Sequence, residues 1–111
     1  MRVFISQPMR GKTNEEILYN MNEVKKALKS VYDDVEIIES YNPDFYCKNV
    51  PLACLGNAIT QLATADLAYF TKGWQDARGC RIECLCALEY GIKTIFEEDI
   101  CQDFTKEWLL D

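Results

Sequence analysis

Short apolar segments alternate with helical segments along the chain, and this order constrains the fold more than any other feature. The expected strands cover residues 2–6, 35–38, 67–70 and 93–96, each a short apolar run. Helices are expected between them at about 13–30, 51–63 and 80–90, with a short final helix at 105–110. Such alternation favours a parallel sheet with right-handed crossovers. We therefore predict one α/β domain over residues 1–111, a flavodoxin-like or Rossmann-like three-layer α/β/α fold with strand order 2-1-3-4.

Local signals support the expected helices. Thr13 and Glu16 have the spacing of a capping box at the start of the first helix. Apolar residues follow at helical spacing: Ile17, Met21, Val24, Leu28 and Val31. Pro51 fits the first turn of the second helix, and its apolar face comprises Leu52, Leu55, Ile59 and Leu62. Gly91 is placed to end the third helix.

Composition excludes several classes of protein. The net charge is −6, which argues against general nucleic-acid binding because duplex affinity depends largely on neutralising phosphates. The apolar run at the N-terminus is too short for a signal peptide, and no run approaches the length needed to span a bilayer. We expect a cytoplasmic protein without a membrane partner.

Six cysteines occur without a single histidine: Cys47, Cys54, Cys80, Cys84, Cys86 and Cys101. Their spacing contains no CxxC pair, which argues against a zinc site. Without a secretion signal they are expected to be reduced, and those in the third helix to serve as small buried residues. No metal and no cofactor are expected.

Two loops should meet where the strand order reverses, which is where open parallel sheets bind ligands. The first loop contains Ser6, Gln7, Pro8, Met9, Arg10, Gly11 and Lys12. It precedes a helix, whose N-terminus favours an anion. Arg10 could bind two oxygens and Gly11 would allow close approach. The loop matches neither GxxxxGK[ST] nor GxGxxG, so a turn glycine beside a solvated arginine remains an alternative.

The second loop leads into the third helix and offers a different set of side chains. Trp74 could stack on a base or ribose, and Arg78 and Arg81 could hold an anion. Glu83 is expected about one turn into the helix, where the helix dipole would keep it ionised as a nucleophile requires. The alternative is an ordinary first-turn glutamate paired with one of the arginines. The remaining candidate residues of this loop are Gly73, Asp76 and Gly79.

With both loops in view, the chain resembles the nucleoside 2-deoxyribosyltransferase-like superfamily. Within it, the chain is similar to a family of small bacterial and phage proteins with the pattern FISQPMRGK followed by GWxxARGCRIE. The likeness spans roughly residues 2–96. It implies a nucleoside or nucleoside monophosphate as ligand and cleavage of its N-glycosidic bond, with Glu83 as nucleophile. It also implies that Met9, Arg10 and Gly11 belong to a loop that binds the 5′-phosphate.

Four positions depart from the pattern of the characterised enzymes. Pro8 stands where the resemblance implies a serine of the phosphate-binding loop, and Ala77 where it implies an aspartate six residues before the nucleophile. Phe4 stands where the resemblance implies a catalytic tyrosine, and Ala58 where it implies a catalytic aspartate, with Asn57 adjacent. Asp76 lies one residue from a second expected aspartate. The resemblance therefore supports the ligand class more than the reaction. Three hypotheses follow: an N-glycosidase or deoxyribosyltransferase, a non-catalytic nucleotide sensor or sequestering module, and a homo-oligomeric interaction protein that uses an aromatic loop at 41–47.

Overall fold

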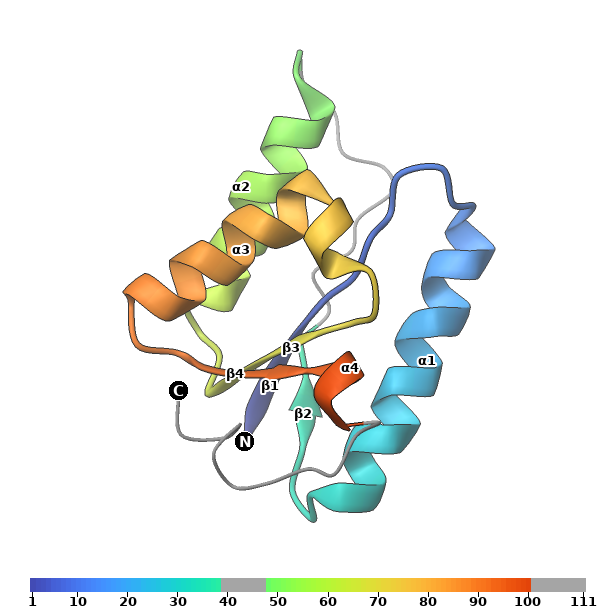
Figure 1. Cartoon of the computed structure of the whole chain (residues 1–111), viewed down its shortest axis with the longest axis vertical. Coiled ribbons are helices and arrows are strands. Elements are labelled where there is room, and N and C mark those ends of the chain that lie inside the picture. Colours follow the sequence, from blue (N-terminus) through green and yellow to red (C-terminus); the bar gives the residue numbers. More distant parts are fainter. Residues whose placement is uncertain (39–47, 101–111) are drawn as a thin grey trace.

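The computed structural model describes residues 1–38 and 48–100 (Figure 1). The elements are β1 (Arg2–Ser6), α1 (Asn14–Val31), β2 (Glu36–Ile37), α2 (Val50–Leu62), β3 (Leu67–Phe70), the 3-10 helix η1 (Trp74–Asp76), α3 (Arg78–Glu89), β4 (Lys93–Phe96) and α4 (Glu97–Ile100). The second strand is shorter than predicted, α3 begins two residues earlier, and α4 was not predicted. The expected helix at 105–110 and the loop at 41–47 lie outside the described residues.

The sheet confirms the predicted topology. Its four strands are parallel and follow the order β2-β1-β3-β4. Ser6 at the end of β1 lies opposite Phe70 at the end of β3. Because both strands end at the same level, the loops that follow them start side by side at one edge of the sheet.

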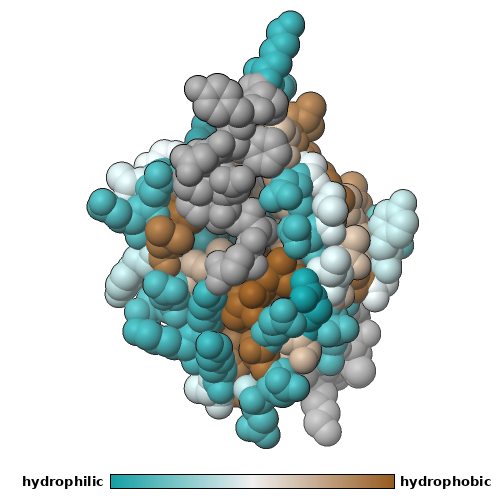
Figure 2. All heavy atoms as spheres, turned by 180° about the vertical axis from the view of Figure 1, so that it is seen from behind, coloured by the Kyte–Doolittle hydropathy of each residue, from teal (hydrophilic) through white to brown (hydrophobic). Residues whose placement is uncertain are grey.

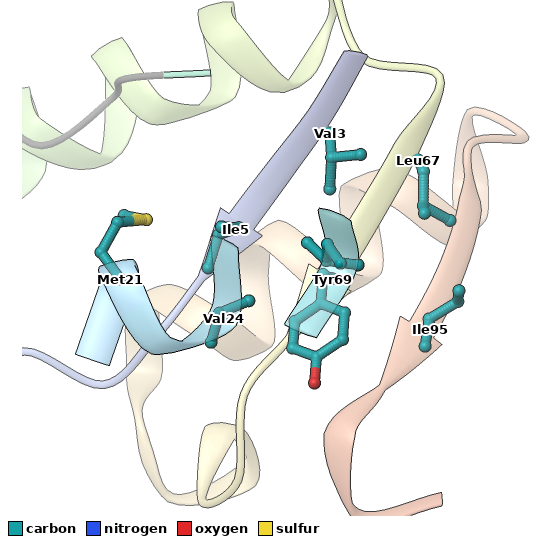
Figure 3. Packing of buried hydrophobic residues seen from close by; sticks show 8 residues of the cluster. Val3, Ile5, Met21, Val24, Leu67, Tyr69 and Ile95 are labelled. Atoms are coloured by element: carbon teal, nitrogen blue, oxygen red, sulfur yellow. The ribbon is translucent and has the colours of Figure 1, made fainter. Parts of the chain in front are cut away.

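Helix α1 covers one face of the sheet (Figure 1). The capping box is formed as predicted: Glu16 N donates to Thr13 Oγ1 at 3.1 Å, and Thr13 N donates to Glu16 Oε1 at 3.0 Å. Figure 3 shows the core on this face, formed by Val3, Ile5, Met21, Val24, Leu28, Leu67, Tyr69 and Ile95. Val31 does not join it and is 72% exposed, because the half-buried Tyr32 packs against this end of the cluster instead.

Helices α2 and α3 cover the opposite face (Figure 1). The buried residues on this face are Phe4, Ile38, Leu62, Ala68, Phe70, Cys84 and Ala87. The predicted apolar face of α2 is only partly correct, since Leu52 is 62% exposed. In Figure 1 the first turn of α2, which contains Leu52, extends beyond the sheet.

Helix α3 ends as predicted at Gly91. Its φ of +74° is the left-handed conformation that glycine adopts at little cost. Ile92 N donates to Ala87 O at 2.8 Å, and Gly91 N donates to Leu88 O at 3.4 Å. These two bonds are those of a Schellman motif, which fixes the direction in which the chain enters β4.

On the face drawn in Figure 2 most of the coloured surface is hydrophilic, although apolar side chains reach it in places. Figure 2 shows one face, where a brown apolar strip near the centre is bordered mainly by hydrophilic residues. On α3, Leu85 is 58% and Leu88 is 50% exposed. Among the helices of the described residues, none has the length and apolar character needed to cross a membrane.

Candidate functional site

A buried hydrogen bond joins the end of β1 to α3. Side chains alternate along β1, so Ser6 faces the same side of the sheet as Phe4, toward α3. There, Ser6 Oγ donates to Glu83 Oε1 at 2.6 Å, although the residues are 77 positions apart. Ser6 is 2% and Glu83 is 8% exposed. The fold thus brings one residue from each predicted loop region into a single polar pair.

Glu83 does not behave as the sequence predicted. Burial raises the pKa of this carboxyl group to about 7, while the hydrogen bond from Ser6 acts in the opposite direction. The expectation of a firmly ionised carboxylate is therefore wrong. Because α3 begins at Arg78, Glu83 is its sixth residue, beyond the first turn where the helix dipole is effective. Desolvation consequently dominates, and both protonation states are populated near neutral pH.

Cys80 lies one turn before Glu83 and shares its environment. Burial raises the pKa of the Cys80 thiol to about 11; a hydrogen bond with Ser6 opposes the rise, and the nearby Glu83 adds to it. A thiol with this pKa is neutral near pH 7 and is a poor nucleophile. The other cysteines in the described ranges, Cys54, Cys84 and Cys86, are also free.

The first loop forms a tight turn at its exposed tip. Lys12 N donates to Met9 O at 3.1 Å, which makes Arg10 and Gly11 the central residues of the turn. The φ of Gly11 is +80°, as the second central position of a type II turn requires. A Cβ at Gly11 would meet no atom within 4 Å, so this glycine is required for its conformation. The turn presents Arg10 to solvent.

Gln7 ties the base of this loop to α1. It is 4% exposed, and its Nε2 donates to Ile17 O at 3.2 Å. Its Oε1 is buried and has no hydrogen-bond partner among the described residues. One side chain thus fixes where the loop leaves the sheet.

The second loop packs against the first. Thr71 N donates to Ser6 O at 2.9 Å, which extends the pairing of the two strands by one residue. Gly73 has a φ of +86°, and a Cβ at this position would lie 3.9 Å from Pro8 Cγ. Farther along, Lys72 N donates to Glu97 Oε2 and Gly73 N donates to Glu98 Oε1, each at 3.1 Å. The start of α4 therefore holds the backbone of this loop.

Trp74 is part of the packing beneath the loop. Its ring stacks on Phe96 with centroids 5.0 Å apart and tilts against Phe70 at 5.6 Å. The residue is half-buried. Any stacking on a ligand, as the sequence suggested, would use the part of the indole that these phenylalanines leave open.

The cations predicted to hold an anion are exposed: Arg10, Lys12, Arg78 and Arg81. Within the described ranges none of them forms an ion pair, and Arg81 Nη1 donates to Gln75 O at 2.9 Å. The alternative in which Glu83 pairs with Arg78 or Arg81 is therefore wrong, since Glu83 bonds to Ser6. The positive charge of Lys12 also acts on the buried Cys80 thiol, because it lowers the pKa of this thiol and so opposes the effect of burial.

The remaining candidates lie around this group. Asp76 is exposed on η1, and Gly79 is half-buried in the first turn of α3. Phe4 is 1% exposed within the core, and Ala58 packs against the same core cluster. Neither position supplies a hydroxyl or carboxyl group to the site.

Sequence reasoning missed two of these contacts. It placed Ser6 in the ligand loop without a partner, although the alternation along β1 directs this side chain toward α3. It also missed the contacts that Glu97 and Glu98 make with the second loop. No pattern within residues 71–79 signals them.

Comparison of the chain with protein-family models, with curated proteins and with solved structures finds no match.

Proposed function

We propose that the chain binds a small nucleotide or nucleoside phosphate at the edge formed by the loops after β1 and β3. The observation that carries this proposal is the buried Ser6–Glu83 pair at that edge. Four exposed cations without carboxylate partners in the described residues belong to the same loops and to the first turn of α3. A buried polar pair with exposed cations on the neighbouring segments suits a ligand with a hydroxyl-bearing centre and an anionic end.

The roles follow from exposure and geometry. Arg10 at the tip of the turn is free to bind two phosphate oxygens, and Arg78 and Arg81 border the other loop. Glu83 can either accept or donate a hydrogen bond near neutral pH because its pKa is about 7. A sugar hydroxyl or a base edge would suit it. The resemblance noted above points to the same ligand class.

A second candidate function is cleavage of the N-glycosidic bond. Ser6 holds Glu83 Oε1, which leaves the second carboxylate oxygen to attack the anomeric carbon. The carbon–oxygen bond would form as the carbon–nitrogen bond breaks, with the base leaving as the protonated species; water would then hydrolyse the ester. Phe4 and Ala58 cannot supply the proton, so Asp76 is the nearest candidate in the sequence. Loss of such a group typically costs about 10²–10⁴-fold in rate.

The homo-oligomer is supported by a separate observation. Leu85, Leu88 and Tyr90 near the end of α3 are each at least half exposed. Apolar side chains gathered on one helix favour burial against another surface. A sedimentation measurement on the protein and on L85K/L88K tests this: a monomer in both would exclude this interface.

One experiment separates binding from catalysis. The protein, E83Q, R10A and the exposed control E89Q are incubated with nucleosides and nucleoside monophosphates. Free base is measured by chromatography and thermal stabilisation in parallel. Release that E83Q abolishes and E89Q retains would establish the enzyme. Stabilisation without release, lost in R10A, would establish the binding module. The absence of both responses would refute the two proposals.

A further inference from the structure

The two glutamates at the start of α4 bind the backbone of the loop after β3. Glu97 Oε2 accepts from Lys72 N and Glu98 Oε1 accepts from Gly73 N, each at 3.1 Å and across 25 positions of the chain. Both glutamates are half-buried, and bonds to a carboxylate are stronger than bonds between neutral groups. Gly73 belongs to the candidate ligand site, whereas Glu97 and Glu98 have no part in the binding or the cleavage considered above.

The bonds inside this loop leave the two amides without a partner of their own. Trp74 N donates to Thr71 O at 3.2 Å, which makes Lys72 and Gly73 the central residues of a turn. Gly73 has a φ of +86° and a ψ of 6°, as the second central position of a type II turn requires. The bond that closes such a turn uses the amide of its fourth residue only, so the two central amides need other acceptors. The carboxylates of α4 supply them.

The end of β4 also supports the aromatic residue of the loop. Phe96 directly precedes Glu97, and its ring stacks on Trp74. The same loop lies close to the loop after β1, since a Cβ at Gly73 would lie 3.9 Å from Pro8 Cγ. Residues 96–98 therefore set the position of the loop after β3 relative to the loop after β1.

We propose that Glu97 and Glu98 are positioning residues of the candidate site, which hold the loop after β3 in the conformation that binds the ligand. This inference rests on the proposed nucleotide binding. Ordering a loop on binding lowers affinity, and the apparent affinity falls in proportion to the fraction of molecules in the binding-competent conformation. The two glutamates act through the backbone of the loop, without touching the ligand. Their charge acts in the opposite direction, because carboxylates near an anionic ligand disfavour its binding.

The test compares two double variants that carry the same charge. E97A/E98A removes both acceptors, whereas E97Q/E98Q keeps side-chain oxygens that can accept the two amide bonds. Each folded protein is titrated with the four common deoxynucleoside 5′-monophosphates, and its free energy of unfolding is measured separately. We expect E97A/E98A to bind about tenfold more weakly than E97Q/E98Q, as when the binding-competent fraction falls to about one tenth. E97Q/E98Q should bind at least as tightly as the wild type.

The two readouts distinguish positioning from a purely structural role. A lower free energy of unfolding in E97A/E98A, with the same dissociation constant as E97Q/E98Q, would overturn the inference and leave the proposed nucleotide binding intact. Equal weakening in both variants would also overturn it, because the effect would then follow the charge. A wild type that binds none of the four nucleotides would refute the proposed function and this inference together. If E97A/E98A does not fold, E98A and E98Q give the same comparison at Gly73, with an expected difference of about threefold.

Discussion

Replacing Glu83 by glutamine tests the electrostatic description of the site most directly. Glutamine has nearly the shape of a protonated glutamate, and its carbonyl oxygen can still accept the hydrogen bond from Ser6. The variant therefore removes the ionisable group and keeps the contact. Its effect should depend on pH, because the pKa of Glu83 is about 7 in the folded chain and 4.5 in the reference state.

Proton linkage determines the direction in which the stability of the wild type changes with pH. The folded state holds the proton of Glu83 more tightly than the unfolded state, so the stabilisation is complete below about pH 4.5 and is lost as the pH rises through about 7. The difference between the pKa of Glu83 in the folded chain and in the reference state corresponds to about 3 kcal/mol in the free energy of unfolding, since one pKa unit corresponds to about 1.4 kcal/mol. The advantage of E83Q over the wild type should therefore grow by about 2–3 kcal/mol between pH 5 and pH 8.

Urea unfolding of both proteins at the two pH values, under reducing conditions, measures this advantage. With a slope of about 2 kcal/mol per molar urea, the relative midpoint of E83Q should rise by about 1 M or more between pH 5 and pH 8. E89Q is the matched control, because it removes an exposed carboxylate from the same helix. A midpoint difference for E83Q that is the same at both pH values, or one that E89Q reproduces, would refute the account of Glu83 given above.

Three further substitutions test the structure around the site. S6A removes the hydrogen bond that opposes the effect of burial, so the pKa of Glu83 should rise above about 7 in a carboxyl ¹³C titration; an unchanged value would contradict the contact. G73A places a Cβ at a φ of +86° and should lower the free energy of unfolding by about 1–2 kcal/mol, whereas Ala at Gly79, inside α3, should be neutral or stabilising. T13A removes the cap of α1 and should cost about 1 kcal/mol in urea unfolding; a loss below 0.3, about the error of such measurements, would argue against the capping box.

The sequence predicted the features that depend on local patterns. The capping box and apolar spacing located α1, and alternation of strands with helices led to the strand order. What it could not supply depends on contacts between distant segments. The Ser6–Glu83 bond joins residues 77 positions apart, and the raised pKa arises from the burial that this packing creates. Similarly, the parallel register of β3 and β4 places Phe96 opposite Phe70. Trp74, which follows β3 in the chain, packs against both rings, and its own segment does not signal this contact.

The candidate site itself was predicted as two loops, and the structure adds how they are joined. Residues of both loops were identified from their types, yet nothing in either segment indicated that Pro8 would approach Gly73. The exposure of Leu52 was also missed because it depends on a neighbouring element. The apolar periodicity of α2 describes this helix alone and does not indicate where the sheet next to it ends.

The two hydrogen bonds between the start of α4 and the loop after β3 affect the local stability of this loop. β4 is the last strand at one edge of the sheet, and such edges open more easily than the strands between them. When β4 and α4 detach together, the Lys72 and Gly73 amides lose the Glu97 and Glu98 carboxylates at the same moment. Their exchange with solvent deuterium should then follow that of β4 and not that of β3, the strand that precedes them. The loop after β3 should therefore open together with β4, the strand that follows it in the chain.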